Sequence, residues 1–345
     1  MSQARWQGIW SRRGPLAWLL WPLSQLYGAL SRLRRNLYAT GLFKIHQLPV
    51  PVIVVGNVIV GGAGKTPTVI ALVKHLQAQG WRPGVVSRGY GRRSDAVLEV
   101  RTGTPAADSG DEPALIQRST GVPVFVATRR VEAAHALLHA HPQVNLLLCD
   151  DGLQHLALGR DVAIAVFDDR GAGNGWLLPA GLLREPWPPR RGNRFQPDLV
   201  LHQQCGTNAR AHSQTDLPTF TAVRRLADHA IGLQGQLTTL HTLKDQPLTA
   251  VAGIARPEVF FDMLRARGLT LAHTVALPDH ADPATYAAVL RTKQTLVCTE
   301  KDAVKLFAAQ PTNGAAVWAV PLELTPAPAF FEALDQRLAK HKPAR

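Results

Sequence analysis

The sequence contains little cysteine, and its cysteines are not arranged as metal ligands or as a disulfide framework. Only three occur in 345 residues, at Cys149, Cys205 and Cys298, and no two have C-x-x-C spacing. Two of them lie in apolar runs typical of buried strands. Structural zinc sites and disulfide-rich secreted folds need closely spaced or paired cysteines. The sequence therefore indicates neither, and it fits a reducing compartment.

Long apolar runs are also missing. The most apolar N-terminal stretch, from Pro15 to Leu30, is shorter than the roughly 20 residues that cross a bilayer, and Pro22, Ser24 and Gln25 interrupt it. No small-residue cleavage site follows, which argues against a secretory signal peptide. We expect this stretch to form a helix that lies on a bilayer rather than crosses it.

Acidic residues are absent from the first quarter of the chain. Residues 1–94 carry 13 Lys and Arg but no Asp or Glu, whereas the rest of the chain carries 25 of each sign. The net charge of +13 is therefore N-terminal, which indicates an anionic membrane or nucleic acid as partner of that end. Tryptophans and leucines between arginines favour the headgroup region of a membrane. The alternative is a helix that packs on its own domain.

The chain does have a glycine-rich segment between a predicted buried strand and a predicted helix. Glycines let successive backbone N–H groups turn towards a phosphate, a following lysine reaches the outer phosphates, and a threonine hydroxyl can bind Mg²⁺. Ile59 stands where the usual spacing has its first glycine, but a plain turn would not need Lys-Thr at the start of a helix. The segment predicts a nucleotide phosphate-binding loop. Its residues are Gly61, Gly62, Ala63, Gly64, Lys65 and Thr66.

Apolar strands alternate with helices along most of the remaining sequence. This pattern predicts an α/β fold with a parallel sheet covered on both faces. A polar run over residues 203–220 breaks the pattern, so we expect a domain boundary there. The predicted parts are an N-terminal interfacial segment (1–44), a P-loop NTPase-like domain (45–218) and a smaller C-terminal α/β domain (219–345).

A pair of acids, Asp150 and Asp151, directly follows a predicted buried strand. In an open parallel sheet, ligands collect at the carboxyl ends of the strands, where a P-loop protein also places a carboxylate for Mg²⁺. With Gln154 and His155 close behind, the pair is a candidate metal and acceptor site. An exposed Asp-Gly turn is the alternative.

Three further segments have an ordinary structural explanation. Asp111, in Gly-Asp-Glu-Pro, has the position of a helix N-cap. His280 lies in a predicted turn, where a lone histidine is more often structural than catalytic. Thr299–Asp302 has the pattern of a helix-starting box. From the residues alone, a catalytic role for these segments stays open.

In order and spacing, the motifs together resemble the tetraacyldisaccharide 4′-kinase family, the lipid A 4′-kinases of Gram-negative bacteria. The resemblance covers nearly the whole chain. The missing first loop glycine is usual in that family, and Leu153 replaces a usual Phe. The matching segments are 35–38, 48–52, 56–57, 61–66, 87–91, 110–113, 150–155, 178–181, 183–186, 278–280 and 299–302.

The resemblance implies an enzyme of lipid A and lipopolysaccharide biosynthesis at the cytoplasmic face of the inner membrane. Its reaction transfers the ATP γ-phosphate to the 4′-hydroxyl of a tetraacyl glucosamine disaccharide 1-phosphate. The implied cofactors are ATP and Mg²⁺. The implied partners are the lipid acceptor and an anionic membrane surface, without nucleic acid or an obligate protein partner.

The resemblance also implies roles for individual residues. Lys65 binds phosphates, and Thr66, Asp150 and Asp151 serve Mg²⁺. Asp111 becomes the general base, supported by His280. The residues implied to line the acceptor site are Tyr90, Glu112, Gln154, His155, Arg184 and Glu185.

A second hypothesis is a membrane-associated nucleotide switch of the partitioning or metal-delivery type. Those NTPases share Gly-Gly-x-Gly-Lys-Thr but carry a lysine just before the paired glycines, where this chain has Val60. Phosphate transfer to an acylated disaccharide would support the kinase, and release of free phosphate alone would support the switch.

Overall fold

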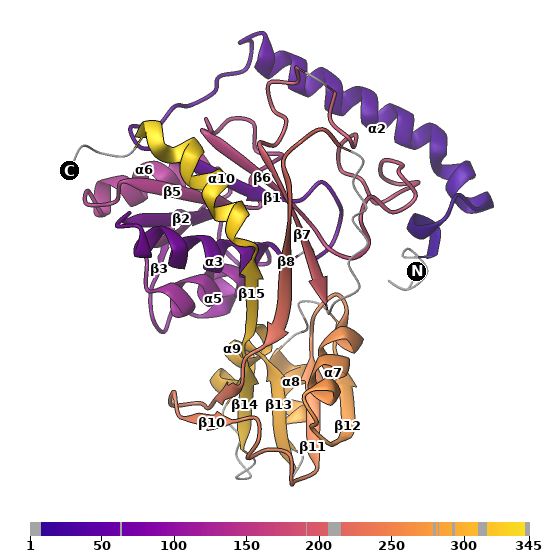
Figure 1. Cartoon of the computed structure of the whole chain (residues 1–345), viewed down its shortest axis with the longest axis vertical. Helices are drawn as coiled ribbons and strands as arrows, with labels where there is room; N and C mark the ends of the chain where they lie inside the picture. The colour runs from indigo at the N-terminus through magenta and orange to yellow at the C-terminus, as the bar shows by residue number, and fades with distance from the viewer. Residues whose placement is uncertain are drawn as a thin grey trace.

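The computed structural model describes residues 8–62, 64–190, 192–205, 215–278, 281, 283–291, 294–309 and 316–341. Two predicted site residues, Ala63 and His280, lie outside these ranges. The described chain forms two sheets with helices on both faces, and a long helix, α2, lies against the larger part (Figure 1).

The larger sheet has nine strands in the order β15-β8-β7-β6-β1-β5-β2-β4-β3. Its seven inner strands are parallel, and the two edge strands, β3 and β15, are antiparallel to their neighbours. The strands are β1 (Val52–Gly56), β2 (Pro83–Ser87), β3 (Leu98–Val100), β4 (Val124–Val126), β5 (Leu146–Asp150), β6 (Val162–Phe167), β7 (Leu199–Cys205), β8 (Thr219–Leu226) and β15 (Leu322–Pro326).

Helices cover both faces because alternate residues of each strand point to opposite sides. Ile53 and Val55 of β1 face a core shared with α3 (Lys65–Ala78), α5 (Asp111–Thr120) and α10 (Pro328–Leu338). Val52 and Val54 face a second core, shared with α6 (Arg130–Ala140) and the loop before β7. The short helix α4 (Ala106–Ser109) precedes α5, and a 3₁₀ turn (Ala339–His341) follows α10.

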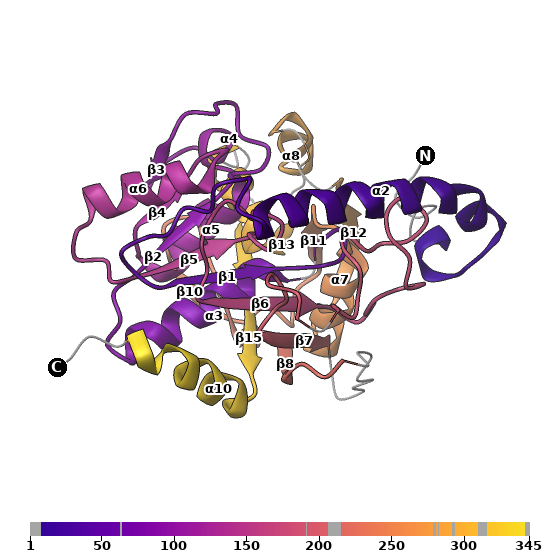
Figure 2. The same cartoon turned by 90° about the horizontal axis from the view of Figure 1, so that it is seen from above.

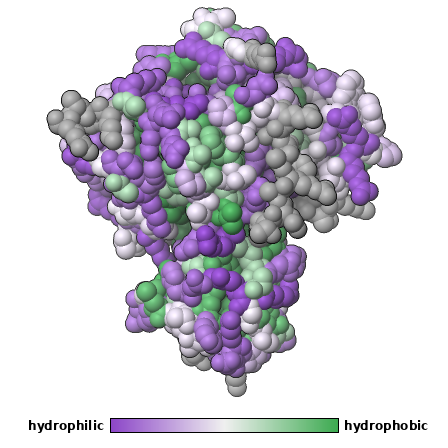
Figure 3. Space-filling view, viewed as in Figure 1, coloured by the Kyte–Doolittle hydropathy of each residue, from purple (hydrophilic) through white to green (hydrophobic). Residues whose placement is uncertain are grey.

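The smaller sheet has six strands in the order β10-β9-β14-β13-β11-β12. Helix α7 covers one face, and α8 and α9 cover the other. In space-filling view the molecule narrows below the larger sheet, and this sheet forms the narrower part (Figure 3). The elements are β9 (His229–Ile231), β10 (Leu237–Thr239), β11 (Leu248–Ala252), α7 (Pro257–Ala266), β12 (Leu271–Ala276), α8 (Pro283–Val289), β13 (Thr295–Thr299), α9 (Glu300–Ala309) and β14 (Val317–Val320).

The predicted α/β fold, with a larger parallel sheet, a smaller second sheet and an N-terminal helix, is confirmed. The sheets do not follow the predicted residue ranges, however. The range 219–345 contributes the strands β8 and β15 to the larger sheet, and the helix α10 to the core on one face of that sheet. The chain leaves the larger sheet after β8 and returns through Pro321 into β15, where Leu322 pairs with Leu226. The division into domains at 44 and 218 stays a prediction.

Helix α2 (Pro15–Ala39) packs through a stripe of small residues on the loop before β7. The Ser24 hydroxyl donates to the Leu177 carbonyl at 2.8 Å, and a Cβ at Gly28 would lie 2.7 Å from the Leu177 side chain. Seen from above, α2 and α10 lie on opposite sides of the molecule (Figure 2). No helix in the described ranges is both long and apolar enough to cross a membrane.

The opposite face of α2 exposes apolar side chains. Five leucines recur at alternating spacings of four and three residues, which places them along one helix face. They form an exposed leucine stripe. Its members are Leu19, Leu23, Leu26, Leu30 and Leu33, each more than half exposed.

Candidate active site

The glycine-rich loop connects β1 to α3 and is held by buried side-chain amides. Gly61 and Gly64 have φ values of 91° and 75°, a backbone region that favours glycine. The Asn57 amide donates to the Gly61 carbonyl at 3.0 Å. Gln203, from β7, donates to the Gly64 carbonyl at 2.6 Å and to the Thr68 hydroxyl at 2.7 Å. The loop backbone is therefore fixed from both sides.

Lys65 and Thr66 begin α3 directly after this loop, as the motif predicts. Both are nearly buried, at 8% exposure. The amino end of a helix carries unpaired N–H groups and partial positive charge, so an anion is favoured there. Loop, lysine and helix end together form a phosphate-binding arrangement.

Asp150 is the last residue of β5, the neighbour of β1, and is fully buried. Burial, and next the negative charge of Glu112, raises the pKa of Asp150 to about 7. Its Oδ1 atom has no hydrogen-bond partner within the described ranges. A buried carboxylate oxygen that has no hydrogen-bond donor is suited to bind a cation.

Asp151 follows with a φ of 48°, which is uncommon for a residue other than glycine. Its Oδ1 lies 3.7 Å from Lys65 Nζ and 3.2 Å from Arg184 Nη1. Burial acts to raise the pKa of Asp151, but the cations Lys65, Arg184 and Arg130 outweigh it and lower that pKa. Asp151 is thus the more acidic member of the pair.

The residues present fit a Mg²⁺ ion whose remaining ligands are phosphate oxygens of a nucleotide and water. Asp150 offers the unpartnered oxygen, Asp151 a charged carboxylate and Thr66 a hydroxyl. Over the described chain, no three or more His, Cys, Asp or Glu side chains gather as a metal site. Mg²⁺ usually combines one or two carboxylates with phosphate oxygens and water, so two acids beside a phosphate loop suffice.

Three of the predicted acceptor-site residues lie together beside Asp151. The Gln154 amide donates to Glu185 Oε1 at 2.7 Å, and Arg184 Nη1 lies 3.4 Å from Gln154 Oε1. Helix α2 contacts the same group. Arg35 pairs with Glu185, and the Tyr27 hydroxyl donates to the Arg184 carbonyl at 2.8 Å.

The other predicted acceptor-site residues are placed differently. Glu112 lines the pocket described next. Tyr90 is 65% exposed. His155 lies among Arg130, Arg160 and further arginines, and burial first, then these charges, lowers its pKa to about 4. His155 is therefore neutral at pH 7.

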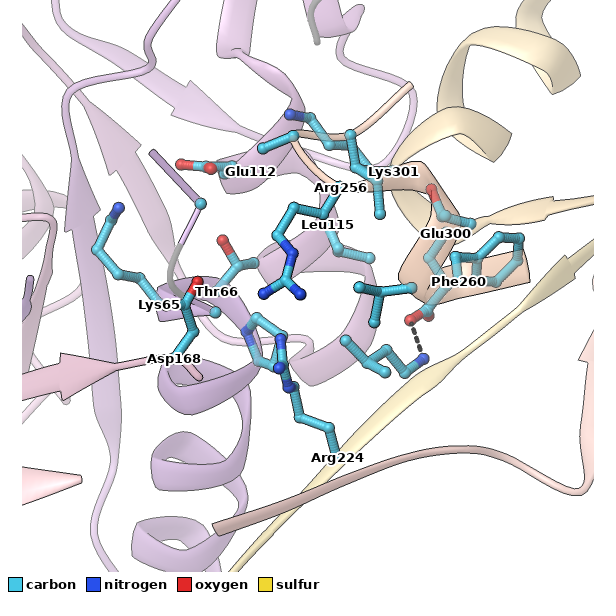
Figure 4. A pocket seen from close by; sticks show the side chains of 18 of the residues that line it. Lys65, Thr66, Glu112, Leu115, Asp168, Arg224, Arg256, Phe260, Glu300 and Lys301 are labelled. Atoms are coloured by element: carbon cyan, nitrogen blue, oxygen red, sulfur yellow. Dashed lines mark hydrogen bonds between the residues drawn. The ribbon is translucent and has the colours of Figure 1, made fainter. Parts of the chain in front are cut away.

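A pocket lies between the two sheets and opens onto the glycine loop (Figure 4). Lys65 and Thr66 stand at one end, with Phe260 and Glu300 towards the other. Its apolar lining comes from both parts of the molecule: Ile70 and Leu115 from the larger part, Val259, Phe260 and Met263 from α7, and Val320 and Leu322 at the crossing. Its charged lining residues are Lys65, Glu112, Asp168, Arg224, Arg256, Glu300 and Lys301.

Asp111 is the first residue of α5, and Gly110 occupies the N-cap position instead. The sequence-based alternative placed Asp111 at the N-cap, whereas Asp111 lies in the first turn of the helix. Asp111 is buried, and its Oδ2 lies 3.1 Å from Lys305 Nζ of α9. This ion pair joins the larger part of the molecule to the smaller one.

The helix-starting box at Thr299–Asp302 is present. The Thr299 hydroxyl donates to Asp302 Oδ2 at 2.6 Å and accepts from the Asp302 amide at 3.2 Å. Asp302 also accepts from the Tyr286 hydroxyl at 2.6 Å and from the Gly253 amide at 3.0 Å. This carboxylate therefore ties β11, α8 and α9 together.

Several residues at this edge were missed by the sequence analysis. Asp168 directly follows β6, so the rule that singled out Asp150 could have found it. It binds Arg170, whose Nη1 donates to the Val60 carbonyl at 3.0 Å. Asn57 and Gln203 carry only a weak signal, a polar residue at the carboxyl end of an apolar run.

The comparisons with known proteins agree with one another. The family described as tetraacyldisaccharide-1-P 4′-kinase matches residues 16–339. A tetraacyldisaccharide 4′-kinase of Polaromonas naphthalenivorans (strain CJ2) is 59% identical over 326 residues, which cover 94% of this chain and 92% of the relative. One from Acidovorax sp. (strain JS42) is 56% identical over 335 residues and covers 97% and 94%.

A solved structure is similar over almost its whole length. It is a crystal structure of the "apo" form of LpxK from Aquifex aeolicus in complex with ATP. The TM-score is 0.77 at 28% identity, and the match covers 94% of this chain and 99% of the other. The resemblance drawn from the motifs is confirmed, and the chain belongs to the tetraacyldisaccharide-1-P 4′-kinase family.

Proposed function

We propose that this chain binds ATP in the pocket between its sheets and transfers the γ-phosphate to the 4′-hydroxyl of a tetraacyl disaccharide 1-phosphate. Membership of the family makes it a phosphotransferase of lipid A biosynthesis. The observation that supports the proposal best is one of position. The phosphate loop lines the pocket with Lys65 and Thr66, and Asp151, which follows β5, lies 3.7 Å from Lys65 Nζ. Asp111 directly precedes Glu112, which lines the same pocket.

The nucleotide is proposed to lie along the pocket with its phosphates on residues 61–65. The apolar lining from Ile70, Leu115 and Phe260 suits a purine, because flat aromatic groups gain from such contact. Lys65 now lies near Asp151 and would turn towards the phosphates, whose charge is larger. Arg224 and Arg256 supply further positive charge on the pocket wall.

Mg²⁺ would be held by Thr66, Asp150 and Asp151 together with phosphate oxygens. When bound, it neutralises charge that develops on the transferred phosphate. Its arrival would also favour the ionised form of Asp150, which burial disfavours.

Asp111 is proposed to accept the proton of the acceptor hydroxyl. A sugar hydroxyl is a poor nucleophile, so a carboxylate within hydrogen-bond reach assists as the new P–O bond forms. Arg184, Gln154 and Glu185 lie beside Asp151 and are proposed to bind the acceptor, with Tyr90, Glu112 and His155 around them. His280 is proposed to support Asp111.

We also propose that α2 rests on the anionic cytoplasmic face of the inner membrane. The leucine stripe faces solvent on the side opposite its packed face. Four exposed arginines on or beside this helix, Arg12, Arg13, Arg32 and Arg34, would favour anionic headgroups by about 1 kcal/mol each. The helix also contacts Arg184 and Glu185 of the proposed acceptor site, so a lipid acceptor could pass directly from the bilayer to that site.

The test is phosphate transfer from γ-labelled ATP to the purified acylated disaccharide 1-phosphate. We expect labelled lipid with the natural chain and at least a ~10²-fold lower turnover with Asp111→Asn, at an ATP KM within about twofold. Arg265→Gln, which removes an exposed ion pair with Asp262 on α7, is the control and should keep full turnover. Free phosphate as the sole product would support the nucleotide-switch alternative instead.

A further inference from the structure

We propose that Lys305 is a positioning residue for the reaction, which orients the Asp111 carboxylate when the smaller part of the molecule lies against the larger one. The inference rests on the proposed role of Asp111 as general base. It assigns a function to a lysine that lies outside the pocket lining and the glycine loop.

The contact is direct and shielded from water. Lys305 Nζ lies 3.1 Å from Asp111 Oδ2, and the two side chains are 15% and 6% exposed. The pair is made between α9 of the smaller part and α5 of the larger, and the two helices pack against each other. A charge pair at this burial interacts more strongly than one at the surface.

Lys305 is itself held in place by neighbours. Its ammonium group donates to the Ala281 carbonyl at 3.3 Å and lies 5.5 Å from the centre of the Tyr286 ring. Tyr286 is fixed in turn by its hydrogen bond to Asp302, at the start of the same helix α9. A lysine held by a carbonyl and an aromatic ring presents its charge at one point, unlike a freely rotating surface lysine.

The positive charge of Lys305 matters to the reaction because it lies next to the carboxylate proposed as general base. Asp111 is buried beside Glu112 and, in the proposed complex, near nucleotide phosphates, whose negative charge would repel its carboxylate. The Lys305 ammonium group attracts that carboxylate and holds it in one orientation. In the reaction the hydroxyl proton passes to Asp111, the hydroxyl oxygen bonds to the γ-phosphorus, and the bond from that phosphorus to the β–γ bridging oxygen breaks. Lys305 stays protonated throughout.

The position of Lys305 also links the base to the arrangement of the two parts. When α9 moves away from α5, Asp111 loses its contact with the Lys305 ammonium group. The base would then be least effective in an open molecule, where water could reach a bound nucleotide. This arrangement would limit transfer of phosphate to water.

The first experiment compares Lys305→Met with Lys305→Arg in the full chain, using the labelled-ATP assay. We expect Lys305→Met to lower kcat by ~10-fold or more with an ATP KM within about twofold, and Lys305→Arg to recover at least a third of the lost activity. The unfolding temperature of each variant is measured alongside. Arg265→Met, at the exposed ion pair on α7, is the matched control and should leave kcat unchanged.

The second experiment is a double-mutant cycle with Asp111→Asn. If Lys305 acts through Asp111, Lys305→Met should change the residual rate of Asp111→Asn by less than about twofold, because the charge it serves is already gone. Equal losses in both backgrounds, or normal kcat in Lys305→Met, would overturn the proposal. If Lys305→Met does not fold, Lys305→Gln takes its place in the same cycle.

The proposed function fails in a different way. It fails if the natural chain labels no lipid, or if Asp111→Asn keeps normal turnover. If only the Lys305 inference is wrong, the natural chain still labels the lipid and Asp111→Asn still loses turnover.

Discussion

Gly64 is a single residue whose backbone and surroundings admit no side chain. Its φ is 75°, and a Cβ would lie 1.8 Å from Gln203 Oε1. We expect Gly64→Ala to displace the loop and to lower kcat/KM for ATP by ~10²-fold or more. Steady-state kinetics with varied ATP measure this effect.

Gly80 gives a matched control for that variant. It has a similar φ of 85°, but nothing lies within 4 Å of an added Cβ. Gly80→Ala should therefore cost about 1 kcal/mol of stability through backbone strain and leave kcat/KM near normal. Equal losses of kcat/KM in the two variants would show that the contact of the added Cβ with Gln203 is not what impairs Gly64→Ala.

His155 should make the protein less stable in acid. Its pKa is about 4 in the folded chain, against 6.5 for an ordinary histidine. Between these values the unfolded chain binds a proton that the folded chain does not, so stability falls as pH falls. His155→Gln should reduce the loss between pH 7.5 and pH 5 by about 1–2 kcal/mol, after allowance for solvent screening.

Urea unfolding at the two pH values measures this difference. Other groups titrate in both proteins, so the comparison of natural chain and variant isolates His155. Parallel losses of stability in the two proteins would show that His155 is not the group responsible.

At the residue scale, local patterns predicted the position of a residue in the fold where that position follows from its neighbours in sequence. Lys65 and Thr66 follow from the loop motif, and Asp150 from an acid at the end of a buried strand. Gln203 could not be predicted in this way, because its partner Gly64 is 139 positions away. The pairing of Asp111 with Lys305 likewise depends on how two sheets are placed.

At the scale of elements, α2 combines two different faces. One packs on the loop before β7 through Ala17, Ser24 and Gly28, and the other carries the leucine stripe. The packed face agrees with the hypothesis of a helix that packs on its own domain, and the leucine stripe is the face that we propose to contact the membrane.

Replacing leucines of the stripe should weaken membrane binding without unfolding the protein. We expect the triple variant Leu19→Ser, Leu26→Ser and Leu30→Ser to bind vesicles with 30% anionic lipid at least ~10-fold more weakly. The reason is that each leucine contributes about 1–2 kcal/mol when it enters an apolar environment. Sedimentation with vesicles measures the binding.

Leu237→Ser is the control, because Leu237 is 69% exposed on β10, an edge strand of the smaller sheet. It should leave vesicle binding unchanged, and both variants should keep the unfolding temperature of the natural chain. Undiminished binding by the triple variant would reject the stripe as the membrane contact.

Elements with a strong apolar signal were predicted best. The buried strands β2, β6, β11 and β13 lie in apolar stretches of the kind from which the parallel sheet was predicted, because burial on both faces favours such stretches. Strand β8 was missed because its residues alternate between buried and exposed and include two arginines. Its antiparallel partner β15 also alternates, with Glu323 and Thr325 exposed, and it ends in proline. Neither strand therefore has the continuous apolar run of a strand inside a parallel sheet.

At the scale of the whole molecule, the pocket depends on both sheets at once. Because residues from both parts line it, a bound nucleotide should stabilise both against unfolding. At 100 times its Kd, a ligand adds about 2.7 kcal/mol to the stability of the folded state. We expect MgATP to raise the unfolding temperature by a few degrees in scanning calorimetry.

Lys65→Ala should lose most of that increase, since the lysine is proposed to bind the outer phosphates. Gly80→Ala should keep it. An equal increase in the natural chain and in Lys65→Ala would place the nucleotide away from the glycine loop.

The crossing between the sheets limits how the molecule can move. Two strands, β8 and β15, reach it side by side, joined where Leu226 faces Leu322 and where the Ala227 amide donates to the Pro321 carbonyl at 2.9 Å. Such a double-stranded ribbon bends readily across its flat face and resists bending within its plane. Opening and closing should therefore follow a single arc, so that each closure returns the α9 ammonium group to the same carboxylate without a search over other orientations.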